Sequence, residues 1–410
     1  MQAQKWEQHL LDWPESERLK AVVYLEVPKL EHCYTMPGIK SDVPLEDMLA
    51  NKANELLQKT IVRPSVPPNQ DGLRELIVVK FSGFQMLGNL RAAVNLTTKL
   101  LTDLGQGYGM AGQPSMNTFQ TFELWACRFQ LLMALKLYNL LSDELLAFEE
   151  LDAPDLYIQY YPQAYGVDKG TLVPFSLRLV HAESLRFTPY PWAAIKRIDA
   201  LEDNVRRVIE YEKENSSDEA IKAWELRLVA VQKLRARTLY FLKEYNLCMM
   251  LYSRIMSKEE DEEKKMSLRF LLARIAAIVG DERNFLHFLK NLSYDTNDKG
   301  TVYLHRALKS VFYGQYNKAL ETISSSGLQP EDARLWNNAA VCMLYSGRLS
   351  DALNIYEKCY DIPNEPLLVN LVSVNELTSR DLKQKKVSIF GENVEKLSDM
   401  FDPSMFKLSS

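Results

Sequence analysis

A glycine and an alanine recur in the C-terminal half of the chain at a fixed spacing. Gly280, Gly314 and Gly347 follow one another at nearly equal intervals. Ala319 and Ala352 repeat the interval between the last two of these glycines. Self-similarity at a period of roughly 34 residues indicates a stack of small structural units, each burying its apolar face against its neighbours. The repeat limits the possible folds more than any other feature of the sequence.

Each repeat unit reads as two helices joined by a tight turn. In the last unit Gly347 ends the first helix, where a left-handed residue favours glycine, and Leu349 begins the second helix. Small residues suit the crossing of the two helices, and bulky residues fill the space between units. This pattern is typical of the tetratricopeptide repeat (TPR). The residues expected to pack the repeats are Gly280, Gly314, Ala319, Trp336, Gly347, Ala352 and Tyr356.

Two upstream units depart from the pattern at single positions. Phe285 stands where the later units have a small residue, so packing must differ there. Lys243 stands where the later units have glycine. We expect TPR-type hairpins over 265–362, with an extension back to about 218.

The remainder of the chain is also predicted to be helical after an irregular start. Prolines at 28, 37, 44, 64, 67 and 68 break up the lead over 1–82, where we expect short helices over 6–13 and 45–60. From about 84, apolar residues recur at threes and fours, including a predicted helix over 119–141. The predicted fold is an all-α helical-hairpin solenoid with TPR repeats in its C-terminal half. We expect three parts: a proline-rich lead (1–82), a helical-hairpin region with Gly- and Tyr/Pro-rich connectors (83–215), and a TPR solenoid with C-terminal capping helices (216–410).

Charge and cysteine content argue against several classes of partner. The formal net charge is -5, so no global attraction to nucleic acid is expected. Five isolated cysteines without metal-ligand spacing are typical of reduced core residues. The longest apolar runs are too short to span a bilayer. The sequence therefore predicts a cytoplasmic protein whose membrane contact is at most peripheral.

Two short motifs resemble catalytic signatures but lack the context that the chemistry needs. The loop from Gly105 to Gly109 resembles a phosphate loop, yet it lacks the Gly-Lys-Ser/Thr ending and follows a helix. His181 and Glu183 match the His-x-Glu motif of zinc deaminases, but the Pro-Cys-x-x-Cys motif that supplies the other zinc ligands does not follow. The sequence therefore predicts no catalytic residue, no cofactor and no metal.

A concave surface lined by the first helices of TPR units commonly binds partners, and its side chains here are mostly apolar. Clamps for a C-terminal carboxylate use basic and Asn side chains, and this surface carries almost no positive charge. It suits a packed helix or a permanent partner better, although the chain's own lead over 1–82 could also cover it. The predicted partner groove consists of Leu304, Leu308, Val311, Asn337, Val341 and Leu344.

Four stretches of the sequence carry a more specific likeness: Leu104–Gly109, Pro154–Pro162, Gly170–Arg178 with His181–Glu183, and Trp336–Cys342. Together they resemble the TPR-containing subunit 12 family of the trafficking protein particle (TRAPP) complex. Further likeness lies in 370–377 and 383–386, and the resemblance covers roughly 84–410. It implies membership of the TRAPP III assembly, a guanine-nucleotide exchange factor for a Rab-type GTPase in early secretory traffic and autophagy. The implied role is a non-catalytic scaffold that joins large and core subunits at the Golgi and the endoplasmic reticulum–Golgi intermediate compartment; the alternative is a stand-alone TPR adaptor or cochaperone.

Overall fold

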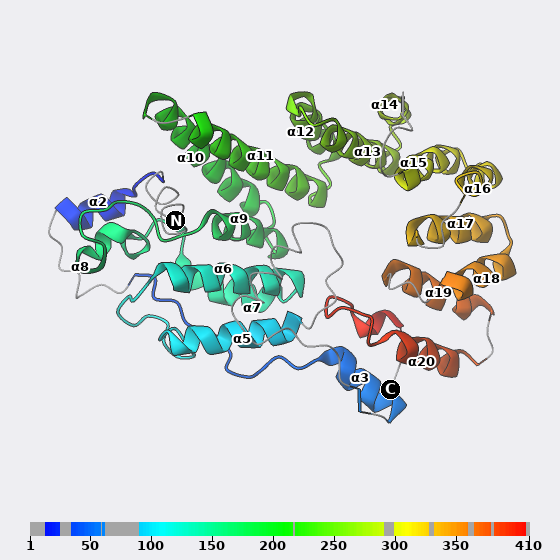
Figure 1. Cartoon of the computed structure of the whole chain (residues 1–410), viewed down its shortest axis with the longest axis horizontal. Coiled ribbons are helices and arrows are strands. Elements are labelled where there is room, and N and C mark those ends of the chain that lie inside the picture. The colour runs from blue at the N-terminus through cyan, green and yellow to red at the C-terminus, as the bar shows by residue number, and fades with distance from the viewer. Residues whose placement is uncertain are drawn as a thin grey trace. The chain divides into compact units, whose positions relative to one another are not determined.

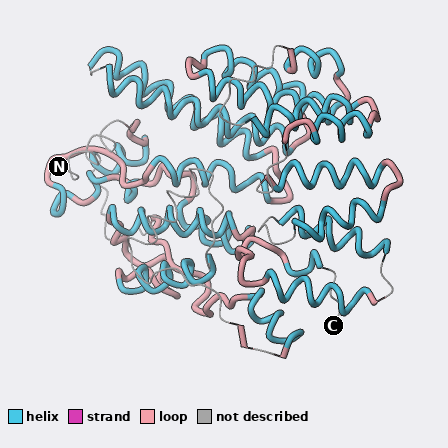
Figure 2. Tube along the Cα trace, turned by 45° about the vertical axis from the view of Figure 1, so that its right-hand side comes forward, coloured by secondary structure: helices cyan, strands magenta, loops and turns pink. Residues whose placement is uncertain are grey.

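The described part of the chain is built from helices. It contains 18 α-helices, several short 3-10 turns and one isolated bridge between Tyr157 and Thr171, and consecutive helices pack as hairpins (Figures 1 and 2). The all-α class predicted from the sequence is therefore confirmed. The computed structural model describes residues 13–24, 34–58, 60–61, 90–215, 218–290, 299–327, 332–359, 365–378 and 381–406.

Contacts divide the chain into two compact units. Unit 1 comprises 1–46 and 65–248, and unit 2 comprises 47–64 and 249–410. The three-part division expected from the sequence stays a prediction. The α-helices of unit 1 are α2 (Glu17–Tyr24), α5 (Leu90–Asp103), α6 (Phe119–Ala134), α7 (Tyr138–Leu145), α8 (Pro162–Tyr165), α9 (Phe175–Ser184), α10 (Ala193–Asn215) and α11 (Asp218–Phe241). After α12 (Tyr245–Lys258), unit 2 contains α13 (Glu262–Val279), α14 (Glu282–Phe288), α15 (Lys299–Phe312), α16 (Tyr316–Ser324), α17 (Ala333–Tyr345), α18 (Leu349–Cys359), α19 (Glu365–Thr378) and α20 (Leu382–Asn393), with α3 (Met48–Leu57) from the N-terminal lead.

The prediction of a single helix over 119–141 is wrong, because the structure has two helices there, α6 and α7. Thr118 caps α6 by accepting a hydrogen bond from the Thr121 amide at 3.2 Å. The helix ends at Ala134, and Lys136 adopts a left-handed conformation with φ of 59°. Neither glycine nor proline marks this turn, so the continuous apolar pattern concealed it.

Left-handed residues also end the first helices of the repeats. Gly280, Gly314 and Gly347 have φ of 79°, 70° and 76°. Lys243, between α11 and α12, adopts the same conformation with φ of 64°. A residue with a Cβ strains in this region, whereas glycine does not. Lys243 therefore makes the same turn as the glycines, at a higher conformational cost.

A buried ion pair joins three helices in unit 1. The guanidinium of Arg128 on α6 donates to both carboxylate oxygens of Glu144 on α7, at 2.7 and 2.8 Å. Its remaining nitrogen donates to the hydroxyl of Thr98 on α5 at 2.8 Å. Arg128 and Glu144 are both fully buried. Loss of either partner would leave a buried charge unpaired, so the pair fixes how these helices meet.

One helix of the N-terminal lead packs within unit 2. The helix expected over 45–60 is confirmed as α3, and its Ala53 is fully buried in a cluster with Leu367 and Phe390 of α19 and α20. Gly391 leaves room for this packing, because a Cβ there would lie 2.9 Å from a methyl group of Leu57. The sequence indicated the helix but not its position. The other expected helix, over 6–13, falls almost entirely outside the described residues, and α2 was not expected.

Replacing Lys243 with glycine should stabilise the protein. Relief of left-handed strain outweighs the greater backbone entropy that glycine loses on folding, for a net gain of about 0.5–1 kcal/mol. Urea unfolding monitored by circular dichroism measures this difference.

Lys222→Gly is a matched control, because Lys222 is exposed within α11. There the same change should destabilise the protein by about 1 kcal/mol, as glycine does inside helices. Equal effects at both positions would contradict the role assigned to the turn.

Candidate partner-binding surface

The small residues predicted at the helix crossings of unit 2 are buried there. Ala319 on α16 and Ala352 on α18 have no exposed surface. Tyr356, one turn after Ala352, is 1% exposed, and Trp336 on α17 is half-buried. Phe285 takes the corresponding place in α14, where it is fully buried and packs against Phe312 with ring centroids 4.6 Å apart. The aromatic ring therefore replaces the close helix approach that alanine permits in the later hairpins.

The predicted groove residues lie on two first helices, α15 and α17. All six side chains are half-buried. Leu304 and Val311 pack against the cluster that contains Ala319. Leu344 packs against the cluster that contains Ala352. Leu308 on α15 and Val341 on α17 are not among the side chains packed against either cluster.

Asn337 has a structural partner on the following first helix. Its side-chain oxygen accepts a hydrogen bond from Asn370 of α19 at 2.7 Å. The hydroxyl of Tyr356 lies 3.4 Å from the same oxygen. Asn337 therefore links α17 to α18 and α19, a role that the sequence reading missed. The available signal was that Asn337 and Asn370 are separated by the same interval as Gly314 and Gly347.

A polar depression between α15 and α16 was also missed. Arg306 and Lys309 line it from α15, and Lys318 lines it from α16. Arg306 and Lys309 are three residues apart and therefore share a helix face. This spacing indicates a basic face on α15, but the prediction of carboxylate-binding residues was limited to the groove.

The deaminase-like pair is part of the core of unit 1. His181 is 5% exposed, and its Nε2 lies 2.7 Å from the carbonyl oxygen of Glu149. Burial lowers the pKa of His181 to about 3, so the ring is neutral. Glu183 forms ion pairs with Arg186 and Arg237. Among the described residues no group of three or more His, Cys, Asp or Glu side chains could hold a metal ion.

The glycine-rich loop organises a buried polar network. Gln106 is fully buried, accepts a hydrogen bond from the indole of Trp125 at 2.7 Å and donates to Asn117 at 3.1 Å. Asp155 accepts hydrogen bonds from the amide and the hydroxyl of Thr35, both at 2.7 Å. Burial raises the pKa of Asp155. These motif residues thus attach Thr35 of the N-terminal lead to the helical part of unit 1, through one carboxylate oxygen of Asp155, while its other oxygen is buried without a hydrogen-bond partner among the described residues.

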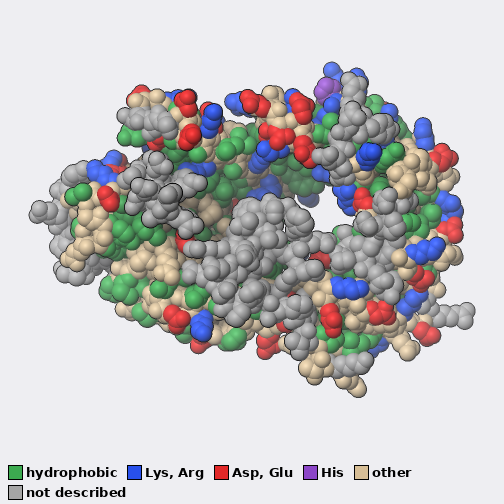
Figure 3. Space-filling view, viewed as in Figure 1, with side chains coloured by type: hydrophobic (Ala, Val, Ile, Leu, Met, Phe, Trp, Pro, Cys, Tyr) green, Lys and Arg blue, Asp and Glu red, His purple; other side chains and the backbone are tan. Residues whose placement is uncertain are grey.

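Charges on the visible surface are mixed. On the face shown in Figure 3, acidic and basic side chains are interspersed among the described residues of both units. No helix among the described residues is long and apolar enough to cross a membrane.

Filling the crossing in the last TPR hairpin should destabilise it. Ala352→Trp places a large ring where no surface is exposed and should cost about 1–3 kcal/mol. Asn354→Trp is a matched control, because Asn354 is exposed on the same helix and should change stability by less than about 0.5 kcal/mol. Thermal melts of both variants measure the difference, and equal melts would contradict the assigned packing.

Comparisons with known proteins find two similar curated relatives. The mouse trafficking protein particle complex subunit 12 is 28% identical over 407 residues, covering 92% of this chain and 50% of the mouse protein. The human subunit 12 is 27% identical over 403 residues, covering 92% of this chain and 54% of the human protein. No protein-family model matches. The chain spans about half the length of these relatives, and over that half it is homologous to trafficking protein particle complex subunit 12.

Proposed function

We propose that the chain is a non-catalytic scaffold subunit of a TRAPP complex. The observation that carries this proposal is the similarity to subunit 12 across 92% of the chain, well beyond the repeats themselves. A likeness limited to the TPR hairpins would support only a common repeat architecture. The buried motif residues of unit 1 lie inside the similar region, so the likeness extends beyond the TPR hairpins.

The finer proposal is membership of the TRAPP III assembly. There the chain would join large subunits to the core that exchanges guanine nucleotide on a Rab-type GTPase. Its place would be the cytoplasmic surface of the Golgi and the endoplasmic reticulum–Golgi intermediate compartment, in secretory transport and autophagy. The chain contributes surface rather than chemistry in this proposal.

The groove favours a permanent partner over a cochaperone. Five of its six side chains are apolar, and the sixth, Asn337, is bonded to Asn370. A TPR clamp for a C-terminal carboxylate needs cationic and amide donors. Half-buried apolar side chains instead suit an apolar interface, above all Leu308 and Val341, which are not packed against either core cluster. We propose Leu304, Leu308, Val311, Val341 and Leu344 as that interface.

Purification of the tagged protein at its native level tests the function. The expected result is stoichiometric co-elution with the TRAPP core and large subunits, measured by quantitative mass spectrometry. Elution as a free chain, or with a molecular chaperone, would contradict the proposal.

Two charges placed in the groove should release the chain from its complex. Leu308→Glu with Val341→Glu is the sharpest variant, because neither side chain packs against a core cluster. We expect loss of co-purifying subunits with an unchanged melting temperature, because a buried unpaired carboxylate is costly at an apolar interface.

Asn354→Glu with Lys318→Glu is the control on the second helices, where both residues are exposed. It should assemble normally. A groove variant that still assembles shows that this surface is not the interface. A groove variant that melts early and aggregates shows that the chain's own lead covers the surface.

A further inference from the structure

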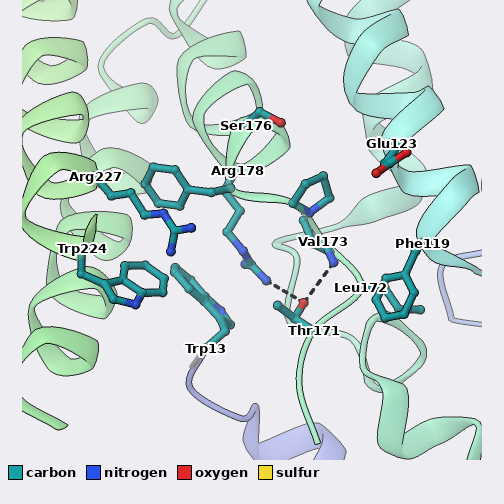
Figure 4. Close-up of a pocket in the computed structure, with 12 residues that line it drawn as sticks. Trp13, Phe119, Glu123, Thr171, Leu172, Val173, Ser176, Arg178, Trp224 and Arg227 are labelled. Carbon is teal, nitrogen blue, oxygen red and sulfur yellow. Dashed lines mark hydrogen bonds between the residues drawn. The ribbon is translucent and has the colours of Figure 1, made fainter. Parts of the chain in front are cut away.

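A small cavity in unit 1 has two arginines in an aromatic wall. It measures about 220 Å³ and is lined by Trp13, Phe175 and Trp224 together with Arg178 and Arg227. Figure 4 shows Arg178 and Arg227 extending toward the Trp13 ring, from α9 and α11 respectively. The proposed scaffold function uses none of these residues.

Arg178 is a buried cation without an anionic partner in the described part of the chain. The side chain is 5% exposed. Its guanidinium donates to the hydroxyl of Thr171 at 2.9 Å and lies 3.9 Å from the centroid of the Trp13 ring. Burial lowers its pKa to about 10. An isolated buried charge is costly, and guanidinium cannot relieve the cost by losing its proton at neutral pH.

The contrast with the other buried arginine of unit 1 is informative. Arg128 is buried to a similar extent, but both oxygens of Glu144 neutralise it. Arg178 has a hydroxyl and an aromatic face in place of that carboxylate. A guanidinium has five N–H donors in a planar arrangement that matches the two oxygens of a carboxylate, and the Thr171 hydroxyl accepts from only one of them.

Two further features add positive potential at the same cavity. Arg227 stacks over the Trp224 ring at 4.1 Å and also lies 5.4 Å from the Phe175 ring. The first residues of α9, Phe175 and Ser176, line the cavity, and no side chain caps this helix at Pro174. A helix N-terminus carries a partial positive charge that favours anions.

The cavity walls limit the kind of anion. At about 220 Å³ the cavity is smaller than the 300–1,000 Å³ of ordinary small-molecule sites, so it holds one side chain rather than a nucleotide. Glu123 of α6 also lines it, and its carboxylate repels a dianionic phosphate more strongly than a monoanion. A lipid headgroup on a flat bilayer does not reach a guanidinium this deeply buried.

We infer that this cavity binds one carboxylate side chain of an acidic linear peptide from a partner protein, on the guanidinium of Arg178 with Arg227 beside it. The inference does not depend on membership of a TRAPP complex. The cavity and the groove of α15 and α17 lie in different units, so each can fail separately.

A peptide array tests the inference with the full-length chain. The probes are acetylated, amidated eight-residue peptides in which a central Asp or Glu has every possible neighbour. The best-binding peptide is then titrated by fluorescence polarisation. Its counterpart with Asn or Gln in place of the central Asp or Glu should bind at least about tenfold more weakly, because the charged hydrogen bond to Arg178 is lost.

Arg178→Met should produce the same loss, at least about tenfold, while keeping or raising the melting temperature. Stability should be retained because the substitution removes a buried cation that has no anionic partner among the described residues. Arg227→Met is a second variant with a half-buried side chain, and it should also weaken binding. Lys222→Met, an exposed cation on the same helix, should leave affinity unchanged.

Three outcomes would overturn the inference. One is an array in which no acidic peptide binds. Another is peptide affinity that does not depend on Arg178. The third is Arg178-dependent binding to phosphatidylserine vesicles without peptide binding, which would make the site a lipid site.

Discussion

The left-handed turn that reverses the chain between paired helices sets the geometry on which the rest of the structure depends. It ends α13, α15 and α17 at Gly280, Gly314 and Gly347. Immediately afterwards a second helix returns along the first, and a small residue lets their backbones approach. Ala319 and Ala352 provide that approach in the last two hairpins, where they are fully buried. Because the last two hairpins share this turn and a similar crossing, they can stack with their apolar side chains in one cluster.

Unit 1 reaches a similar result by different interactions. Its turn at Lys136 has no glycine, and the hairpin is fixed by the Arg128–Glu144 pair instead. The network around Gln106 and Asp155 then attaches the N-terminal lead through Thr35. The hydrogen bonds of these buried residues position the elements of unit 1. Arg178 differs from them because no carboxylate among the described residues is bonded to it.

The sequence predicted the parts of the fold that depend on local periodicity. Apolar spacing located most helices, and glycine at fixed spacing located the hairpin turns. Turns without glycine were harder, because Lys136 lies within an uninterrupted apolar pattern. The docking of α3 in unit 2 could not be predicted, since Ala53 and Leu367 share a cluster although they lie near opposite ends of the chain. Local propensity carries no information about such pairs, and only tertiary packing decides them.

The two candidate surfaces differ in the same respect, because the sequence predicted the groove on α15 and α17 but not the cavity in unit 1. Helical projection placed Leu308 and Val341 on the first helices, where both are half-buried. It could not show that Asn337 bonds to Asn370, because side-chain pairing across helices depends on their crossing geometry. Nor could it bring together Trp13 and Arg178, which are far apart in the sequence. Both surfaces depend on the stacking of hairpins, but the repeat pattern of the sequence predicts only the groove.

We propose that the α15 and α17 surface joins this chain to a multi-protein complex. A cryo-electron microscopy map of the complex purified through this chain tests it most directly. We expect the chain at full occupancy, with density from another subunit packed against Leu308 and Val341. A map in which those two side chains face solvent, or in which the chain is absent from the particle, would contradict it.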